Sequence, residues 1–255
     1  MPTPADYDAI IARLNWSWDH LQRYKARLVG AQVRYHWTML PKVKTKSGYY
    51  IDIVVDEAAP IPDDVKFIIG DCVHSLRASL DNLIYSLCPP GRGKHAEFVL
   101  ADTRADWRRW RYRVKCLPYR AFGTLYKLQP FHPQQGPDPK WNALWVLNRL
   151  WNDDKHRAPH VAMGVADAAS IDAEVPIFPV FCSGPLELDA VVARVWFWTD
   201  TEPDLQPHLR FDIAFDEGGP ARGGSVYYSL WNLHDIVRQV VALFKHLFTD
   251  DPTST

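Results

Sequence analysis

Hydrophobic residues recur at helical spacing in four segments, and each segment carries a continuous apolar stripe along one side. These segments are residues 6–29, 62–87, 139–152 and 226–248. Gly30 fits a C-terminal stop for the first, and the prolines and acidic residues just before the second fit a helix start. The pattern therefore predicts four helices that bury their stripes against one another.

A second pattern, the alternation of apolar and polar residues, marks strands. It occurs at 31–40 and 49–56, which a basic turn joins, and again in several runs between 158 and 216. Helices followed by a block of strands and a closing helix indicate an α+β fold in a single domain, 1–255. We predict a helical bundle from 6–29, 62–152 and 226–248, packed beside a small antiparallel sheet from 31–56 and 158–216.

The predicted helix at 62–87 has an unusual polar side. From residue 70 to 87 it contains no Lys, Glu or Gln, although these residues normally fill an exposed helix face. Short polar groups and one arginine stand there instead: Asp71, His74, Arg77, Asp81 and Asn82. Such a face is better suited to meeting partners at fixed geometry than to facing water.

Two interpretations of this face stay open. His74 and Arg77 are three residues apart and Arg77 and Asp81 are four apart, so each pair can touch on a helix. A carboxylate beside a histidine tunes its pKa and fixes its tautomer, which suits general acid–base catalysis. Alternatively, Arg77 binds Asp81 in a structural polar layer, since structural ion-pair networks use the same residue types.

A second polar cluster, Asp154-Lys155-His156-Arg157, lies just past the predicted helix at 139–152. Cations at a helix C-terminus stabilise the helix dipole and bond the last carbonyls, which is one explanation. The other is an anion-binding corner in which Lys155, His156 and Arg157 hold a phosphate. The functional interpretation requires this corner to meet the polar side of the helix at 62–87.

Residues 104–120 form the most basic segment, with aromatic rings between the charges. Guanidinium groups interleaved with rings suit single-stranded nucleic acid. The spacing of Trp107 and Trp110 favours instead a surface helix whose rings dock on the core under the arginine stems.

Composition limits the classes of partner that the chain as a whole can attract. Apolar residues make up 47% and charged residues 23%, and the formal charge of −1 predicts no global attraction to nucleic acid or to an anionic membrane. The N-terminus lacks the layout of a signal peptide, and no apolar run is long enough to span a bilayer.

The four cysteines are scattered, so we expect reduced, mostly buried thiols in the cytoplasm, without a structural zinc or another cofactor.

The chain resembles a widespread bacterial family of uncharacterised proteins through three motifs. The first, I-G-D-x-x-H-[NS]-L-R-x-x-L-D-[HN]-L, covers residues 69–83, with Ser75 where the family more often has Asn. The second is Leu128-Gln129-Pro130, and the third is D-K-H-R at 154–157. The resemblance implies no established activity.

More loosely, the predicted bundle resembles HEPN domains. These helical bundles often act as metal-independent ribonucleases in toxins and phage defence, with two protomers pooling their sites and a motif of Arg, four to six residues and His. Arg77 begins such a motif, but Asn82 stands at the fifth position after it. Asn can orient a 2′-hydroxyl but cannot shuttle its proton, so His74 or His156 takes that role.

The HEPN resemblance implies an RNA-binding protein with ribonuclease activity that is able to form a homodimer, and the cysteines and the N-terminus predict a cytoplasmic location. The expected site consists of His74, Arg77 and His156 as catalytic residues, with Asp71, Asp81, Asn82, Asp154, Lys155 and Arg157 as binding residues. One alternative is a non-enzymatic interaction module whose polar face locks the bundle or a dimer. Another is a small-molecule binder that uses the tryptophan-rich space between bundle and sheet.

Overall fold

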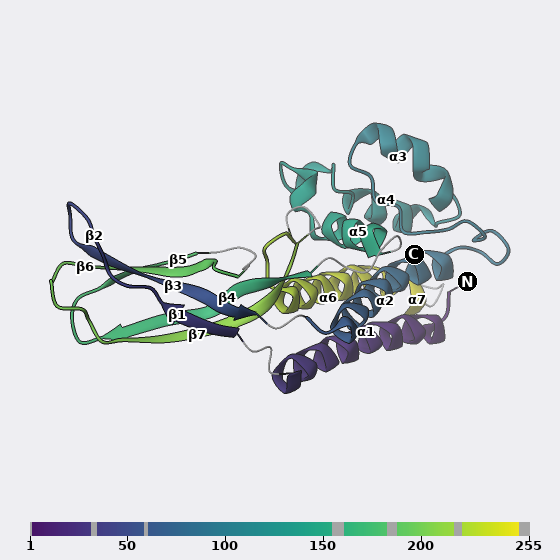
Figure 1. The fold of residues 1–255 in the computed structure, drawn as a ribbon. Helices are drawn as coiled ribbons and strands as arrows, with labels where there is room; N and C mark the ends of the chain where they lie inside the picture. Colours follow the sequence, from purple (N-terminus) through teal and green to yellow (C-terminus); the bar gives the residue numbers. More distant parts are fainter. Residues whose placement is uncertain are drawn as a thin grey trace.

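The computed structural model describes residues 2–31, 35–58, 61–154, 161–182, 188–216 and 221–249. Helices gather at one end of an elongated molecule, and two antiparallel sheets extend from them (Figure 1). The α+β fold predicted from the sequence is confirmed.

The four predicted helices are all present, with ends within a few residues of the expected ones. They are α1 (Pro4–Ala31), α2 (Asp63–Leu87), α5 (Ala143–Asp154) and α6 (Val226–Leu243), and α6 is followed by the short α7 (His246–Thr249). A 3-10 turn, Pro139–Trp141, takes up the start of the segment predicted for α5. Within the described residues, no helix is long and apolar enough to cross a membrane.

The bundle is built around α2, whose apolar stripe is fully enclosed. Ile69, Leu76 and Leu80 have no exposed surface, because α1, α5 and α6 all pack against this helix. Burial of side chains of this size contributes roughly 1.5–3 kcal/mol each. This packing therefore determines which side of α2 faces outward.

The β portion consists of two sheets that face each other. Strands β1 (Tyr35–Met39), β3 (Tyr49–Ala58), β6 (Val191–Phe197) and β5 (Phe178–Phe181) form the first sheet in that order, with β2 (Val43–Lys44) paired to β3. Strands β4 (Val161–Ala173) and β7 (Leu205–Phe215) form the second. Ile51 and Val195 of the first sheet share a buried cluster with Leu205 of the second.

The second sheet joins the bundle through a partly buried polar contact. Tyr24 of α1 donates a hydrogen bond of 3.4 Å to the Asp212 carboxylate of β7. The Ser225 hydroxyl, which also caps the N-terminus of α6, donates to the same carboxylate. One side chain of β7 thus links two helices to the second sheet.

The segment between α2 and α5 covers one side of the bundle. It contains α3 (Arg104–Trp110), the 3-10 helices η1 (Arg111–Val114) and η2 (Pro133–Gln135), and α4 (Tyr119–Lys127). The Gln129 side chain is buried and accepts from the Ala101 amide at 3.0 Å while donating to the Val99 and Leu125 carbonyls. The Leu128-Gln129-Pro130 motif thus has a structural role.

The prediction for the cysteines was wrong for two of the four. Cys88 and Cys116 form a disulfide that ties the end of α2 to the residues after η1. Their Cα atoms lie 5.0 Å apart only because the chain folds back over 28 residues, which spacing along the sequence does not reveal. Cys72 is a buried thiol as expected, whereas Cys182 is exposed. The cytoplasmic location, which was inferred from reduced thiols, stays a prediction.

Candidate functional site

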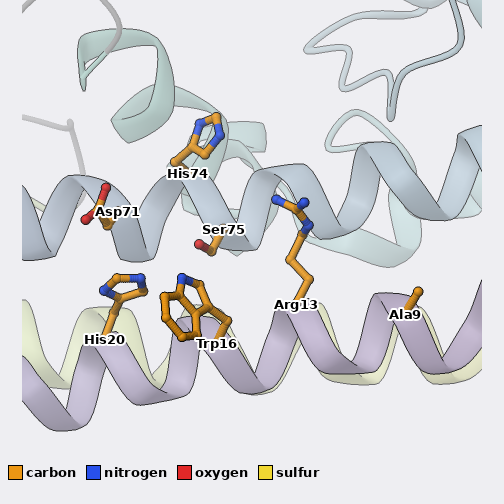
Figure 2. A pocket seen from close by; sticks show the side chains of 7 residues that line it. All are labelled: Ala9, Arg13, Trp16, His20, Asp71, His74 and Ser75. Carbon is orange, nitrogen blue, oxygen red and sulfur yellow. The ribbon is translucent and has the colours of Figure 1, made fainter.

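A cleft of about 500 Å³ opens between α1 and α2 (Figure 2). We call it the α1–α2 cleft. Its lining combines two histidines, an arginine, a carboxylate and a tryptophan with two small residues: Ala9, Arg13, Trp16, His20, Asp71, His74 and Ser75. Two of the sequence-predicted site residues, Asp71 and His74, are therefore placed at an open cleft.

The α2 side of the cleft follows from the helical repeat. Cys72 and Val73 point into the core, which leaves Asp71 and His74 exposed on the opposite side of the helix. In Figure 2 the Ser75 side chain points toward α1, whereas His74 leaves α2 on the other side. We call Asp71 and His74 the open end of the polar face.

The α1 side contributes residues that sequence reasoning missed. Arg13, Trp16 and His20 are spaced by three and four residues, which places them on one face of a helix. The Arg23 guanidinium lies over the Trp16 ring at 5.1 Å, and the Trp16 and His20 rings meet edge to face at 5.2 Å. The spacing of these three residues shows in the sequence that they share one helix face. It points to a site only once that face is known to lie opposite α2.

The electrostatics of the cleft favour a neutral His20. Its side chain is almost fully buried, and this burial lowers the pKa of His20 below the ordinary value of 6.5 while Asp71 opposes the shift. Its imidazole is therefore uncharged near neutral pH and able to accept a proton or a hydrogen bond.

Asp154, the last residue of α5, lies beside the open end of the polar face. A Cβ on Gly70 would stand 2.7 Å from its Oδ1 atom, so the glycine gives this carboxylate the room it occupies. Burial raises the pKa of Asp154 above its ordinary value and Asp71 adds to the shift, whereas His74 opposes it. The structure thus places the first residue of the D-K-H-R motif near Asp71 and His74.

Lys155, His156 and Arg157 follow Asp154 directly and lie outside the described residues. Their roles stay predictions.

Arg77 and Asp81 are placed differently, and we call them the buried end of the polar face. Arg77 is only 3% exposed, and its Nη2 atom is 3.1 Å from Oδ1 of Asp81, which also accepts the Phe98 amide at 2.8 Å. The guanidinium lies over the Trp151 ring of α5 at 4.9 Å. Burial lowers the pKa of Arg77 below its ordinary value, and the Asp81 carboxylate opposes the shift.

The structure therefore separates Arg77 from His74. The two side chains line different cavities, although they are three residues apart on one helix. The predicted contact between Arg77 and Asp81 is confirmed. Asn82, the next residue, is half-buried.

The basic segment 104–120 adopts the arrangement in which its rings dock on the core. Trp107 is buried, and its ring packs against Phe122 and Tyr126 of α4 at 5.5 and 5.6 Å. Thr103 caps the N-terminus of α3 by accepting the Asp106 amide. Most of the arginines of this segment are exposed: Arg104, Arg108, Arg109, Arg111 and Arg120.

In the described part of the chain, no group of three or more His, Cys, Asp or Glu side chains is arranged to hold a metal ion. Comparisons of the chain with protein-family models, with curated proteins and with solved structures found no match. The resemblances drawn from the sequence motifs stay predictions.

Proposed function

We propose that the protein binds single-stranded RNA along the α1–α2 cleft and cleaves it by acid–base catalysis, as HEPN ribonucleases do. The observation that carries the proposal is that Asp71 and His74 of α2 lie at an open cleft while Asp154 of α5, far away in the sequence, comes close to both. Titratable groups that gather at a cleft are candidates for catalysis.

The α1 side of the cleft supplies groups that suit a single strand. Arg13 is exposed and points toward α2 in Figure 2, where it can neutralise a phosphate. Trp16 is half exposed, with Arg23 stacked on its ring, and a base can stack on such a ring. In this arrangement Arg13, together with Lys155 and Arg157, neutralises the phosphate, since Arg77 is buried.

The proposed reaction is transfer of the phosphoryl group to the neighbouring 2′-hydroxyl. The 2′-oxygen bonds to phosphorus as its proton passes to His74, and the bond to the 5′-oxygen breaks. That leaving oxygen takes a proton from His156, two residues beyond Asp154. The products are a 2′,3′-cyclic phosphate and a 5′-hydroxyl, with atoms and protons balanced.

Cleavage of a labelled single-stranded RNA by purified variants tests the proposal. His74→Ala and His156→Ala should each slow cleavage by ~10²-fold or more, the usual contribution of a general acid or base. His95→Ala is the matched control, because His95 is exposed in the loop after α2. Undiminished cleavage in both test variants would reject the enzymatic assignment.

A second candidate function is a non-enzymatic interaction module, with a second copy of the chain as one partner. The burial of Arg77 against Trp151 of α5 favours it, because this end of the polar face packs one helix on another and does not face solvent. If this function is correct, the wild type and the alanine variants at Asp71 and His74 should all show RNA cleavage at background level only. Sedimentation of the wild-type chain would then have to show a dimer that Asp71→Arg dissociates.

A further inference from the structure

The first sheet has one face that is buried and one that is open, and we call the open one the outer face. On the buried face, Ile51 and Val195 pack toward the second sheet. The strand register places a row of apolar side chains on the outer face, across β2, β3, β6 and β5: Val43, Tyr50, Trp196 and Phe178. Phe178 is 61% exposed, and the described helices gather at the other end of the molecule (Figure 1).

The two central strands, β3 and β6, have the residue pattern of strands that are covered on both faces. A strand with one face in water alternates apolar and polar residues, whereas a strand buried on both faces is apolar nearly throughout. Apart from one aspartate and one arginine, the central outer positions of these strands are apolar: Tyr50, Val54, Val191 and Trp196. An exposed apolar patch of this kind marks an interaction site.

The two charged residues in the middle of the outer face neutralise each other. Asp52 accepts from Nε and Nη2 of Arg194 at 2.7 Å each, and the guanidinium lies over the Tyr50 ring at 4.2 Å. The middle of the face therefore has no net charge to attract nucleic acid or an anionic membrane. Two copies related by a two-fold axis through this pair bring Arg194 of one copy opposite Asp52 of the other, so their charges match.

The size of the outer face fits a protein partner. Four strands side by side span about 19 Å, and β6 and β3, with seven and ten residues, extend for about 23 and 33 Å. Side chains that stand off the sheet raise this flat area toward the ~800 Å² per partner that a standard protein interface buries. The apolar row crosses the full width of the sheet, so a partner has to cover all four strands to bury it.

We propose that a second copy of the chain covers the outer face, and that the protein is a two-fold dimer whose first sheets pack face to face. Packed sheets lie about 10 Å apart, with the side chains of the facing surfaces interdigitated. The α1–α2 cleft of each copy stays open in this dimer, because it belongs to the helical end of the molecule (Figure 1). The proposal does not depend on RNA cleavage.

Sedimentation equilibrium of the full chain tests the proposal. We expect a dimer with a Kd below ~10 µM. Phe178→Lys should raise this Kd by ~100-fold or more, because it places a lysine of each copy in the apolar interface. Phe178 is largely exposed in the single chain, so the variant should keep the circular dichroism of the wild type. If it fails to fold, Val180→Lys, on the same face of β5 and 43% exposed, takes its place with the same expected result.

Phe67→Lys is the matched control, because it makes the same change at a phenylalanine of α2 that is 65% exposed. A dimer that survives Phe67→Lys and dissociates in Phe178→Lys supports the proposal. A monomeric wild type, a dimer that survives Phe178→Lys, or equal dissociation in both variants overturns it. If Asp71→Arg dissociates the dimer and Phe178→Lys does not, the interface lies on the polar face of α2, which also overturns the inference. RNA cleavage that depends on His74 stands or fails separately from all these results.

Discussion

Asp71 and His74 at the open end of the α2 polar face are exposed to solvent, whereas Arg77 at the buried end is enclosed by α5 and the segment 97–100. Both ends combine a carboxylate with a cationic or titratable group at helical spacing. At the buried end the carboxylate is held by Arg77 and a backbone amide, and the guanidinium is packed on an indole ring. At the open end Asp71 and His74 are exposed and are among the residues that line the α1–α2 cleft.

The difference teaches that residue type does not decide the role of a polar helix face. What decides it is which neighbouring helix covers each turn. The Trp151 ring of α5 packs on Arg77. The Asp154 carboxylate, at the end of the same helix, packs next to Gly70, and His74 is exposed. The open end is therefore accessible from solvent, whereas the buried end packs α2 against α5.

Removing the Asp81 carboxylate at the buried end should have the largest effect on the free energy of unfolding. Asp81→Ala leaves the Arg77 charge buried and the Phe98 amide without its acceptor, so we expect a loss of about 3 kcal/mol in the free energy of unfolding. Urea denaturation measures it. Asp71→Ala, the same change at the open end, should cost less than about 0.5 kcal/mol. Equal losses in the two variants would contradict the distinction.

A methyl group at position 70 should separate activity from stability. Gly70→Ala places its Cβ 2.7 Å from the present position of Asp154 Oδ1, so the Asp154 carboxylate must move. Cleavage of RNA should fall ~10-fold through misplacement of catalytic groups. The melting temperature should hold or rise, because alanine favours a helix by up to ~1 kcal/mol.

Gly123→Ala in α4 is the control for that variant, since nothing lies within 4 Å of the added Cβ. It should gain similar stability and keep full activity. Unchanged cleavage in Gly70→Ala would show that the position of the Asp154 carboxylate does not matter to the reaction.

The helices and the polar side of α2 were predictable from the sequence. The contacts between helices were not, for a physical reason. Helical periodicity located α2 and its polar side, and the four-residue spacing predicted the contact between Arg77 and Asp81. Periodicity does not reveal which helices meet, so it missed Trp16 and His20 and the enclosure of Arg77 by Trp151. The Cys88–Cys116 disulfide was missed for the same reason, since it depends on a chain reversal.

Acidification tests the α1 side of the cleft, with a smaller expected effect. Because burial lowers the pKa of His20 in the folded state, the unfolded chain binds this proton more tightly. The stability from neutral His20 is therefore full above the ordinary pKa of 6.5 and is lost as the pH falls below it. Denaturation between about pH 7 and pH 5 should show a shallower loss of stability in His20→Gln than in wild type. If the free energy of unfolding fell equally steeply with pH in both proteins, this would contradict the burial of His20 in solution.

The smallest effect is expected in the basic segment. Arg111 is exposed beside rings that dock on the core, so Arg111→Glu should change the free energy of unfolding by less than about 0.5 kcal/mol. RNA cleavage should fall by no more than ~2-fold, as expected for a charge that contributes only general attraction. A much larger fall in filter-binding affinity for RNA would move the binding surface from the cleft to residues 104–120.

Ultraviolet crosslinking of a bound single-stranded RNA, followed by mass spectrometry of the crosslinked peptides, tests the central claim most directly. The proposal that RNA lies in the α1–α2 cleft predicts crosslinks within residues 13–20 of α1 and 71–74 of α2. Crosslinks confined to residues 104–120, or RNA that fails to crosslink anywhere on the chain, would contradict it.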